Sequence, residues 1–169
     1  MKLYENNLPR VNKILHHPDY IKYISEIEEL EKDRIFCRHN MEHFVSVARI
    51  AWILNIEENR GLDREMIYAA ALLHDIGRGQ EYLTGVRHEE ESARLASPII
   101  ESAGFDVSEK EALISAIATH RDGDFAIAHQ DSLNALIYRA DKLSRPCYRC
   151  MASDKCTKPA EKRNMELII

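Results

Sequence analysis

The chain is poor in the features that interrupt a fold or anchor it in a membrane. Its 169 residues include only 6 glycines and 5 prolines, and no low-complexity tract, so long disordered linkers are not expected. The longest apolar run, Met66–Leu73, has eight residues, whereas a membrane span needs about 20. The first residues, MKLYENN, lack the hydrophobic segment of a signal peptide. These absences predict a cytoplasmic protein without a membrane partner.

Positive charge is also scarce. Lys and Arg total 23 against 28 Asp and Glu, and the net charge is −5. A broad basic surface for duplex nucleic acid is therefore not expected, although a few cations inside a site would suffice for a small phosphorylated molecule. Four cysteines in a cytosolic chain are more typical of thiols or metal ligands than of disulfides. The oligomeric state is left open.

Apolar residues recur at helical spacing, and no stretch alternates as a strand does. The fold is therefore predicted to be all-α, a single-domain helical bundle. Residues 77–87 contain three glycines and are predicted to be a flexible connection, and Pro98 should kink or break its helix. The predicted helices are 18–33, 38–58, one capped by Asp63 and leading to His74, 89–102, one opened by a capping box at Ser108–Glu111, one starting at Asp131 or Ser132, and a short one near Glu161–Leu167.

Ionisable residues interrupt the apolar faces of five predicted helices. His74 continues the buried stripe of Ala70 and Ala71, and Asp75 sits one step around the same helix. A buried carboxylate beside a buried imidazole is costly unless a partner or a metal compensates it. Each such residue alone could be a satisfied core residue, but several together are what a metal site inside a helical bundle requires. The other members of this set are His43, His88, His120 and Asp141.

The order of these residues resembles the HD phosphohydrolase superfamily over residues 38–145. The matching segments are His43-Phe-Val-Ser-Val-Ala48, Ala-Leu-Leu-His74-Asp75-Ile-Gly and Ala140-Asp141-Lys142. His88 and His120, in His88-Glu-Glu-Glu-Ser-Ala93 and Ala-Ile-Ala-Thr-His120-Arg121, resemble the extra histidines of the two-metal branch, such as the HD-type dinucleoside polyphosphate hydrolases.

The resemblance implies two divalent metals per chain. One would be held by His43, His74, Asp75 and Asp141, and the second by His88 and His120, with the Asp75 carboxylate bridging. Iron or manganese is what the resemblance implies, while nitrogen and oxygen ligands would also suit zinc or nickel.

The remaining histidines are assigned by position. His39 competes with His43 as the first ligand because the two lie one helical turn apart. The spacing to Val47 and Ala48 favours His43, which leaves His39 next to the site or facing solvent. The histidines expected at the surface are His16, His17 and His129.

Phosphate binding should need cations near the metals. Arg78, Arg121, Lys142 and Arg145 each follow a candidate ligand closely in the sequence and are predicted to bind phosphate. The alternative for each is a solvated charge near a helix C-terminus, where Lys and Arg are common.

The C-terminal tail contains a cysteine cluster. Cys147, Cys150 and Cys156, with Cys37 or a histidine as fourth ligand, could hold a structural zinc. Reduced thiols that pack the tail, or redox-sensitive thiols, are the alternatives, and the resemblance does not extend to this region. The predicted organisation is a helical extension (1–37), an HD core (38–145) and a cysteine-containing tail (146–169) packed on the same domain.

The expected activity is metal-dependent phosphohydrolysis. A metal-bridging hydroxide would attack a phosphate ester or anhydride in line, with His74 and Asp75 at the catalytic centre. The expected substrate is a nucleotide or another small phosphorylated metabolite. Two alternatives are a di-iron HD oxygenase and a catalytically silent nucleotide-sensing module, although a pure sensing module would not need all six ligands.

Overall fold

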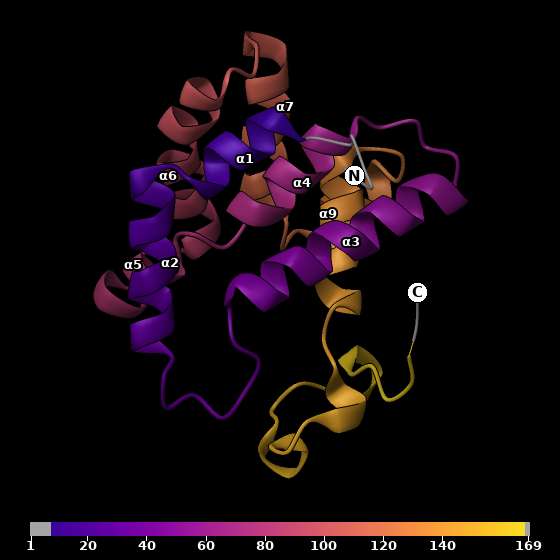
Figure 1. Ribbon diagram of the computed structural model, residues 1–169. Coiled ribbons are helices and arrows are strands. Elements are labelled where there is room, and N and C mark those ends of the chain that lie inside the picture. Colours follow the sequence, from indigo (N-terminus) through magenta and orange to yellow (C-terminus); the bar gives the residue numbers. More distant parts are fainter. Residues whose placement is uncertain (1–7, 168–169) are drawn as a thin grey trace, which may run out of the picture.

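In the computed structural model, which describes residues 8–167, every regular element is helical. This confirms the predicted all-α class. No helix in the described range is long and apolar enough to cross a membrane. The α-helices, shown in Figure 1, are α1 (Pro9–Leu15), α2 (Pro18–Leu30), α3 (Met41–Glu57), α4 (Arg64–Leu73), α5 (Arg78–Thr84), α6 (His88–Ala103), α7 (Val107–Thr119), α8 (Gly123–Ala128) and α9 (Leu133–Leu143).

Helix α4 is the centre of the bundle. It contacts α1, α3, α6, α7 and α9, and residues 69–73 are all buried. A helix that is surrounded on all sides needs apolar residues around its whole circumference, which the longest apolar run of the sequence supplies. The small side chains of Ala69, Ala70 and Ala71 add little bulk between α4 and its neighbours.

Several helices begin at side-chain caps. Asn40 caps α3 by accepting a hydrogen bond from the His43 N–H (3.1 Å), and Asp63 caps α4 as predicted. The capping box predicted at Ser108–Glu111 is wrong. Helix α7 begins earlier, because Asp106 and Glu109 cap each other's backbone N–H groups and Ser108 lies inside the helix.

Pro98 does not interrupt α6, which continues from His88 to Ala103. Pro98 cannot donate a backbone hydrogen bond, but Leu95, Ile99 and Ile100 on the same helix are buried in the core. Packing of this face therefore holds the helix together where the backbone alone would favour a break.

The flexible connection predicted at residues 77–87 is wrong. Residues 78–84 form α5, which ends at Gly85 with φ 76°. Gly79 supports packing rather than flexibility, since it is buried and a side chain there would face Ile27 and Leu30 of α2. Of the three glycines in residues 77–87, only Gly85 uses the left-handed backbone conformation that glycine favours.

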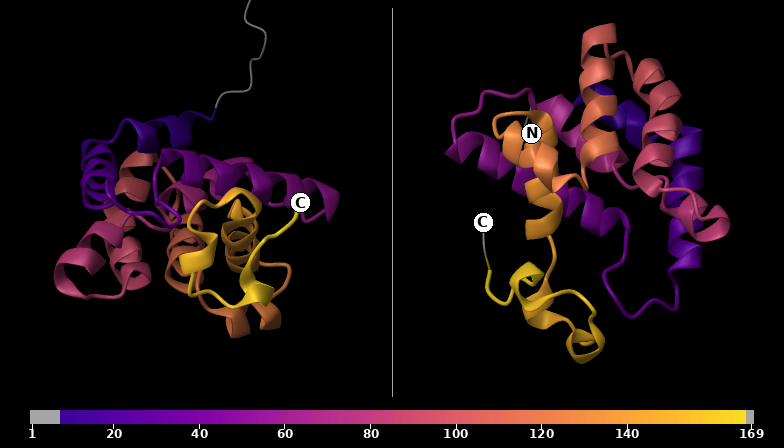
Figure 2. Two further views of the ribbon diagram at one scale, coloured as in Figure 1. Left: turned by 90° about the horizontal axis from the view of Figure 1, so that it is seen from below. Right: turned by 180° about the vertical axis from the view of Figure 1, so that it is seen from behind.

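The C-terminal tail lies below the end of α9 (Figures 1 and 2). Hydrogen bonds from the side chain of Asn164 hold it against the end of that helix. The Asn164 side-chain amide donates to the carbonyls of Lys142 (2.8 Å) and Leu143 (3.2 Å), which the end of α9 leaves without helical partners. It also donates to the carbonyl of Arg145 (3.0 Å), just beyond the helix. The short helix predicted near Glu161–Leu167 is wrong, because only a 3₁₀ turn forms at Ala160–Lys162. The two other turns of the tail are Cys147–Arg149 and Ser153–Lys155.

Candidate metal centre

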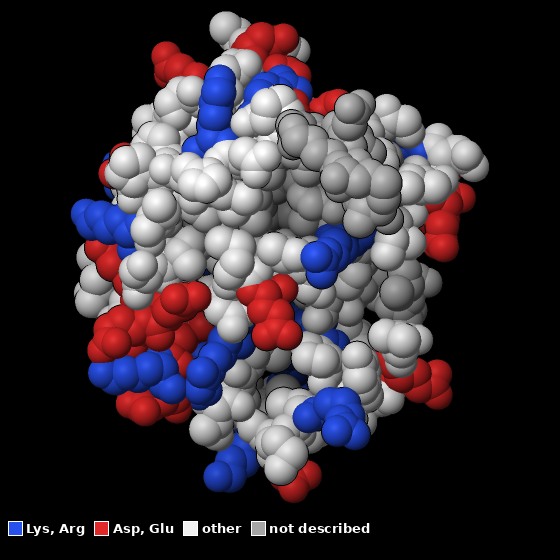
Figure 3. Space-filling view, in the orientation of Figure 1, with Lys and Arg blue, Asp and Glu red and all other residues white. Residues whose placement is uncertain are grey.

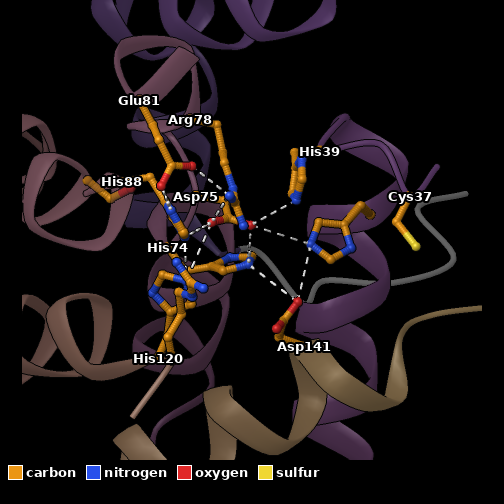
Figure 4. A network of polar contacts seen from close by, with 12 residues as sticks. Cys37, His39, His74, Asp75, Arg78, Glu81, His88, His120 and Asp141 are labelled. Carbon is orange, nitrogen blue, oxygen red and sulfur yellow. Dashed lines mark hydrogen bonds and ion pairs between the residues drawn. The ribbon is translucent and has the colours of Figure 1, made fainter. Parts of the chain in front are cut away.

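Five helices direct ionisable residues to one place (Figure 4). His43 lies in the first turn of α3, and His88 is the first residue of α6. His74 and His120 directly follow the last residues of α4 and α7. Asp75 comes next after His74, and Asp141 lies in the last turn of α9. The six residues that the sequence nominated as metal ligands are thus brought together from distant parts of the chain.

One carboxylate oxygen of Asp75 belongs to a first group of ligands. Asp75 Oδ2 lies 3.3 Å from His74 Nε2 and 3.9 Å from His43 Nε2. Asp141 Oδ1 lies 3.6 Å from His43 Nε2 and 4.0 Å from His74 Nε2. The four ligand atoms fall within 4.8 Å of one another, so one metal ion could contact all of them.

The other oxygen of Asp75 belongs to a second group. Asp75 Oδ1 lies 3.0 Å from His88 Nε2 and 3.4 Å from His120 Nε2, and the two imidazole nitrogens are 3.3 Å apart. These three atoms also fall within 4.8 Å of one another. Asp75 therefore faces two separate sets of imidazoles, one with each oxygen.

The imidazole protons are held away from the centre. His74 Nδ1 and His120 Nδ1 each donate a 2.7 Å hydrogen bond to a carbonyl of the preceding helical turn, that of Ala71 and Ile117. His88 Nδ1 lies 3.0 Å from a carboxylate oxygen of Glu81. In the neutral rings the lone pairs of Nε2 therefore point at Asp75. His43 Nδ1 lies 3.4 Å from the Ser144 hydroxyl, the longest of these contacts.

The arrangement of these atoms fits a bound cation. His43 Nε2, His74 Nε2 and Asp75 Oδ1 are buried and have no hydrogen-bond partner among the described residues. Buried polar atoms without partners are rare and costly. In the second group, two nitrogen lone pairs and an anionic oxygen converge, which is unfavourable unless a positive charge lies between them. Imidazole nitrogen with carboxylate oxygen is a donor set for divalent transition metals.

The protonation states also suit metal binding. Burial alone would raise the pKa of Asp75, but His74 and Arg78 hold it well below its usual value. Burial opposes ionisation of Asp141 too, yet Lys142 and other neighbours lower its pKa. Burial lowers the pKa of His43 to about 4 and also lowers that of His120. Near neutral pH the carboxylates are thus anionic and these two imidazoles neutral, the forms that bind metal. Burial opposes protonation of His74, but Asp75 and Asp141 raise its pKa, so a metal at His74 Nε2 would replace a proton there.

Three of the four predicted phosphate-binding cations lie at the centre. Arg78 Nε is 3.2 Å from Asp75 Oδ1, while Lys142 Nζ (2.5 Å) and Arg145 Nη2 (3.3 Å) both approach Asp141 Oδ2. In the view of Figure 3, Lys and Arg side chains border a hollow between the loop that precedes α3 and the tail. Lys142 and Arg145 therefore lie beside the first group of ligands, whereas Arg78 contacts the Asp75 oxygen that faces the second group.

Arg121 lies elsewhere. Its guanidinium is 3.6 Å from Glu89 Oε2, behind the His88 ring rather than on the side of His88 Nε2. There it lines a surface cavity of about 370 Å³ together with Arg87, Glu89 and Asp122. This position is less suited to a phosphate bound at the metals.

His39 approaches the centre without joining either group. Its Nε2 lies 3.7 Å from Asp75 Oδ2, and its backbone N–H and Nδ1 each lie 2.6 Å from an oxygen of Glu31. Glu31 is almost fully buried and also accepts a hydrogen bond from the Tyr82 hydroxyl. His39 is therefore held in place at the edge of the site. Of the other histidines, His16 and His129 are exposed, and His17 is half-buried and accepts a hydrogen bond from Asp19 N as the cap of α2.

The structure does not gather the cysteines into a metal site. Cys37, Cys147, Cys150 and Cys156 are all free thiols, and no three of these described residues place their sulfur atoms within 4.8 Å of one another. Cys37 is nevertheless close enough to Cys147 and Cys150 for their charges to influence its pKa, which burial raises. The structural zinc stays a prediction.

Three residues near the site could not be identified from the sequence. Glu81 and Glu31, which support His88 and His39, lie in or next to segments whose contacts with the site depend on tertiary packing. Lys158 of the tail is the third, since its pKa is lowered by burial and by Arg145 and Lys142, which places it near the same cations. The only local signal was the spacing of Arg78 and Glu81, which form an i, i+3 ion pair once residues 78–84 are read as a helix.

Comparison with known proteins defines the class of this helical bundle. The HD domain family matches residues 40–145, and the chain belongs to that family. The crystal structure of a predicted HD superfamily hydrolase from an uncultured Thermotogales bacterium superposes with a TM-score of 0.62 and 25% identity. The match covers 89% of this chain and 82% of that one.

Sequence relatives fall into two kinds. An uncharacterized protein of Clostridium beijerinckii is 39% identical over 160 residues, which are 95% of this chain and 99% of that one. Ribonuclease Y 1 of Pediococcus pentosaceus (29% identical) and ribonuclease Y of Enterococcus faecalis (30% identical) each match over 128 residues. These matches cover 76% of this chain but 22% of either ribonuclease, so the ribonucleases are much longer proteins.

Proposed function

We propose that this chain is a metal-dependent phosphohydrolase that uses two divalent metals to hydrolyse a phosphate ester or anhydride. The observation that carries the proposal is the position of Asp75, whose two oxygens face two different sets of imidazole nitrogens. The likeness to a predicted HD superfamily hydrolase supports hydrolysis as the reaction type.

The residues of the chain would prepare the site for such a reaction. Divalent metals bound here would neutralise charge on a phosphoryl oxygen and lower the pKa of a water molecule. His43, His74, Asp75 and Asp141 would hold one metal, and Asp75, His88 and His120 the other. Arg78 forms an ion pair with Asp75 and helps to keep its carboxylate ionised. The anionic state of Asp75 and Asp141 favours metal over protons.

The substrate is proposed to be a nucleotide or another small phosphorylated metabolite. Lys142 and Arg145 lie on the side of Asp141, where His43 and Asp141 keep 14% and 11% of their side-chain surface exposed. His88 and His120 are almost completely buried, at 0% and 2%. A phosphate would therefore approach the first group of ligands, where Lys142 and Arg145 can donate hydrogen bonds to it.

The test is anaerobic purification, metal analysis and a phosphate-release screen. The screen should contain nucleotides, sugar phosphates and dinucleoside polyphosphates, each with iron, manganese, zinc and nickel. Single-stranded RNA oligonucleotides belong in it as well, because two relatives are named ribonucleases. We expect two metal equivalents per chain and turnover of at least one phosphorylated compound.

Other results would favour the alternatives. Oxygen uptake by a mixed-valence iron form would point to an HD oxygenase. Tight nucleotide binding without turnover under any metal would point to a sensing module. If the Asp75→Ala variant kept both its metal and its hydrolytic activity, the assignment of the site itself would be wrong.

A further inference from the structure

The four imidazoles of the centre are supported in different ways. His74 and His120 donate their Nδ1 protons to neutral backbone carbonyls, and His43 faces a hydroxyl. The ring of His88 alone has carboxylates behind it: Glu81 Oε1 at 3.0 Å and Glu89 Oε2 at 3.4 Å from Nδ1. A carboxylate that accepts the far proton of a ligand histidine makes the other nitrogen more basic and fixes the orientation of the ring.

Glu81 is the carboxylate that makes this contact. It lies on α5, one turn after the segment that carries Asp75, and Figure 4 shows it above the His88 ring. Its second oxygen is 2.7 Å from Arg78 Nη1, and Arg78 Nε in turn lies 3.2 Å from Asp75 Oδ1. Glu81, Arg78 and Asp75 thus form a chain that connects the back of the His88 ring to the oxygen faced by His88 Nε2.

Glu89 has other partners. Its Oε1 accepts hydrogen bonds from Arg87, and its Oε2 faces Arg121 at 3.6 Å without forming a hydrogen bond. Glu89 is therefore near His88 but does not hold its proton.

Glu81, His88 and Glu89 could also be viewed as a separate metal site, since their ligand atoms lie within 4.8 Å of one another. A metal at His88 Nδ1 together with one at Nε2 would require the ring to lose both protons. A hydrogen bond from His88 Nδ1 to Glu81 gives both atoms a partner and lets the ring keep one proton.

We propose that Glu81 is a positioning residue for the second metal group. By accepting the Nδ1 proton of His88, it keeps the Nε2 lone pair directed at Asp75 Oδ1 and strengthens His88 as a ligand. The affinity of the Asp75–His88–His120 group for a divalent metal then depends on Glu81, whereas the affinity of the first group does not. This inference rests on the two-metal function proposed above.

The experiment is a Mn²⁺ titration of the full chain, stripped of metal and monitored by competition with a chelator. In Glu81→Ala we expect the second equivalent to bind about 10–100-fold more weakly and the first to be unchanged. Glu81→Gln, which keeps an acceptor but not the charge, should fall between this variant and the wild type. Glu91→Gln is the matched control, because Glu91 lies on α6 near His88 but pairs with Arg94.

Each other outcome overturns the inference in its own way. Wild-type binding of both equivalents in both Glu81 variants would show that His88 needs no carboxylate. An equal loss at both groups would mean that Glu81 only maintains the packing of α5. A Glu89→Gln variant that matches Glu81→Ala would assign the role to Glu89. If the wild-type chain binds a single equivalent, the two-metal function fails, and this inference fails with it.

Discussion

The two ligand groups of the centre share Asp75 but differ in their surroundings. The first group, His43, His74 and Asp141, is partly open and has Lys142 and Arg145 beside it. The second group, His88 and His120, is closed and has carboxylates behind it. Lys142 and Arg145 would compete with a metal for Asp141, whereas Glu81 would favour a metal at His88. If the proposed function is correct, we expect the substrate to contact the first group and the second group to retain its metal more tightly.

The largest effect is expected where the two groups meet. Asp75→Ala removes an oxygen ligand from both groups and leaves the Nε2 atoms of His88 and His120 without an anionic partner. We expect both metal equivalents and all hydrolysis to be lost, as measured by elemental analysis and phosphate release. Asp33→Ala, at an exposed acid outside the centre, is the control and should keep both. Retention of full metal and full rate by Asp75→Ala would refute the shared-carboxylate arrangement.

Single histidine variants should separate the two groups. His120→Ala should remove about one metal equivalent and leave the first group loaded, because the ligands of that group do not include His120. His43→Ala should remove the other equivalent and leave the second group intact. Elemental analysis of the two variants side by side measures the difference. Two retained equivalents in either variant would contradict the two-group model.

Gly77 offers a way to disturb the second group through the backbone. A Cβ at Gly77 would lie 2.5 Å from Ser92 N and 2.6 Å from His88 O, so α6 would have to move away from the segment that carries Asp75. Gly77→Ala should lower the unfolding free energy by about 1–3 kcal/mol and weaken the second metal more than the first.

Gly79→Ala is the matched control for this variant. The neighbours of a Cβ at Gly79 lie at ordinary contact distances, 3.7 Å or more. This variant should be neutral or more stable by up to about 1 kcal/mol. Thermal unfolding and metal titration of both variants provide the measurement, and equal tolerance of the two changes would contradict the close approach at Gly77.

The smallest effect on the metal centre is expected from a change at Glu31, which holds His39 in place at the edge of the site. Burial would raise the pKa of Glu31, but hydrogen bonds from His39 and Tyr82 lower it from 4.5 to about 2. A lowered carboxylate pKa means that this stabilisation is complete above about pH 4.5 and is lost as the pH falls towards 2. Glu31→Gln should reduce the unfolding free energy at neutral pH by about 1–3 kcal/mol and flatten its decline over this interval.

Glu58→Gln provides the comparison for Glu31. Hydrogen bonds from Arg139 and Arg60 outweigh burial and also lower the pKa of Glu58 to about 2, but Glu58 is exposed. High salt should therefore remove most of the effect of Glu58→Gln and little of that of Glu31→Gln. Denaturation curves of both variants at low and high salt, between pH 2 and 7, would test this, and equal salt sensitivity would argue against a buried Glu31.

Much of the fold could be predicted because helical periodicity is a local property. The apolar run at Met66–Leu73 identified the central helix, and Asp63 identified its start. The missed helix α5 contains Gly79, whose helical state depends on packing against Ile27 and Leu30 of α2. The capping box was misplaced by two residues, because both Asp106 and Ser108 precede a Glu at the required spacing and only the folded chain selects between them.

The candidate ligands could also be predicted from the sequence, because each lies on, or at the edge of, the apolar face of a predicted helix. They are His43, His74, Asp75, His88, His120 and Asp141. The residues that contact these candidate ligands could not be predicted in the same way. Glu81 and Glu89 are both close to His88 in the sequence, and only the packing of α5 against α6 brings Glu81 to the Nδ1 atom. Arg121 adjoins His120 in the sequence but turns towards Glu89.

The sequence by itself determined the all-helical class, the central helix and the set of ionisable residues that interrupt the apolar faces, because each depends on a repeat of 3.6 residues along one helix. The tertiary structure alone decided which oxygen of Asp75 faces which imidazoles and which carboxylate supports His88. It also decided that no three cysteine sulfurs among the described residues come within 4.8 Å of one another. These features depend on distances of a few ångströms between helix ends. Such distances are set by the packing of the whole bundle rather than by any one segment.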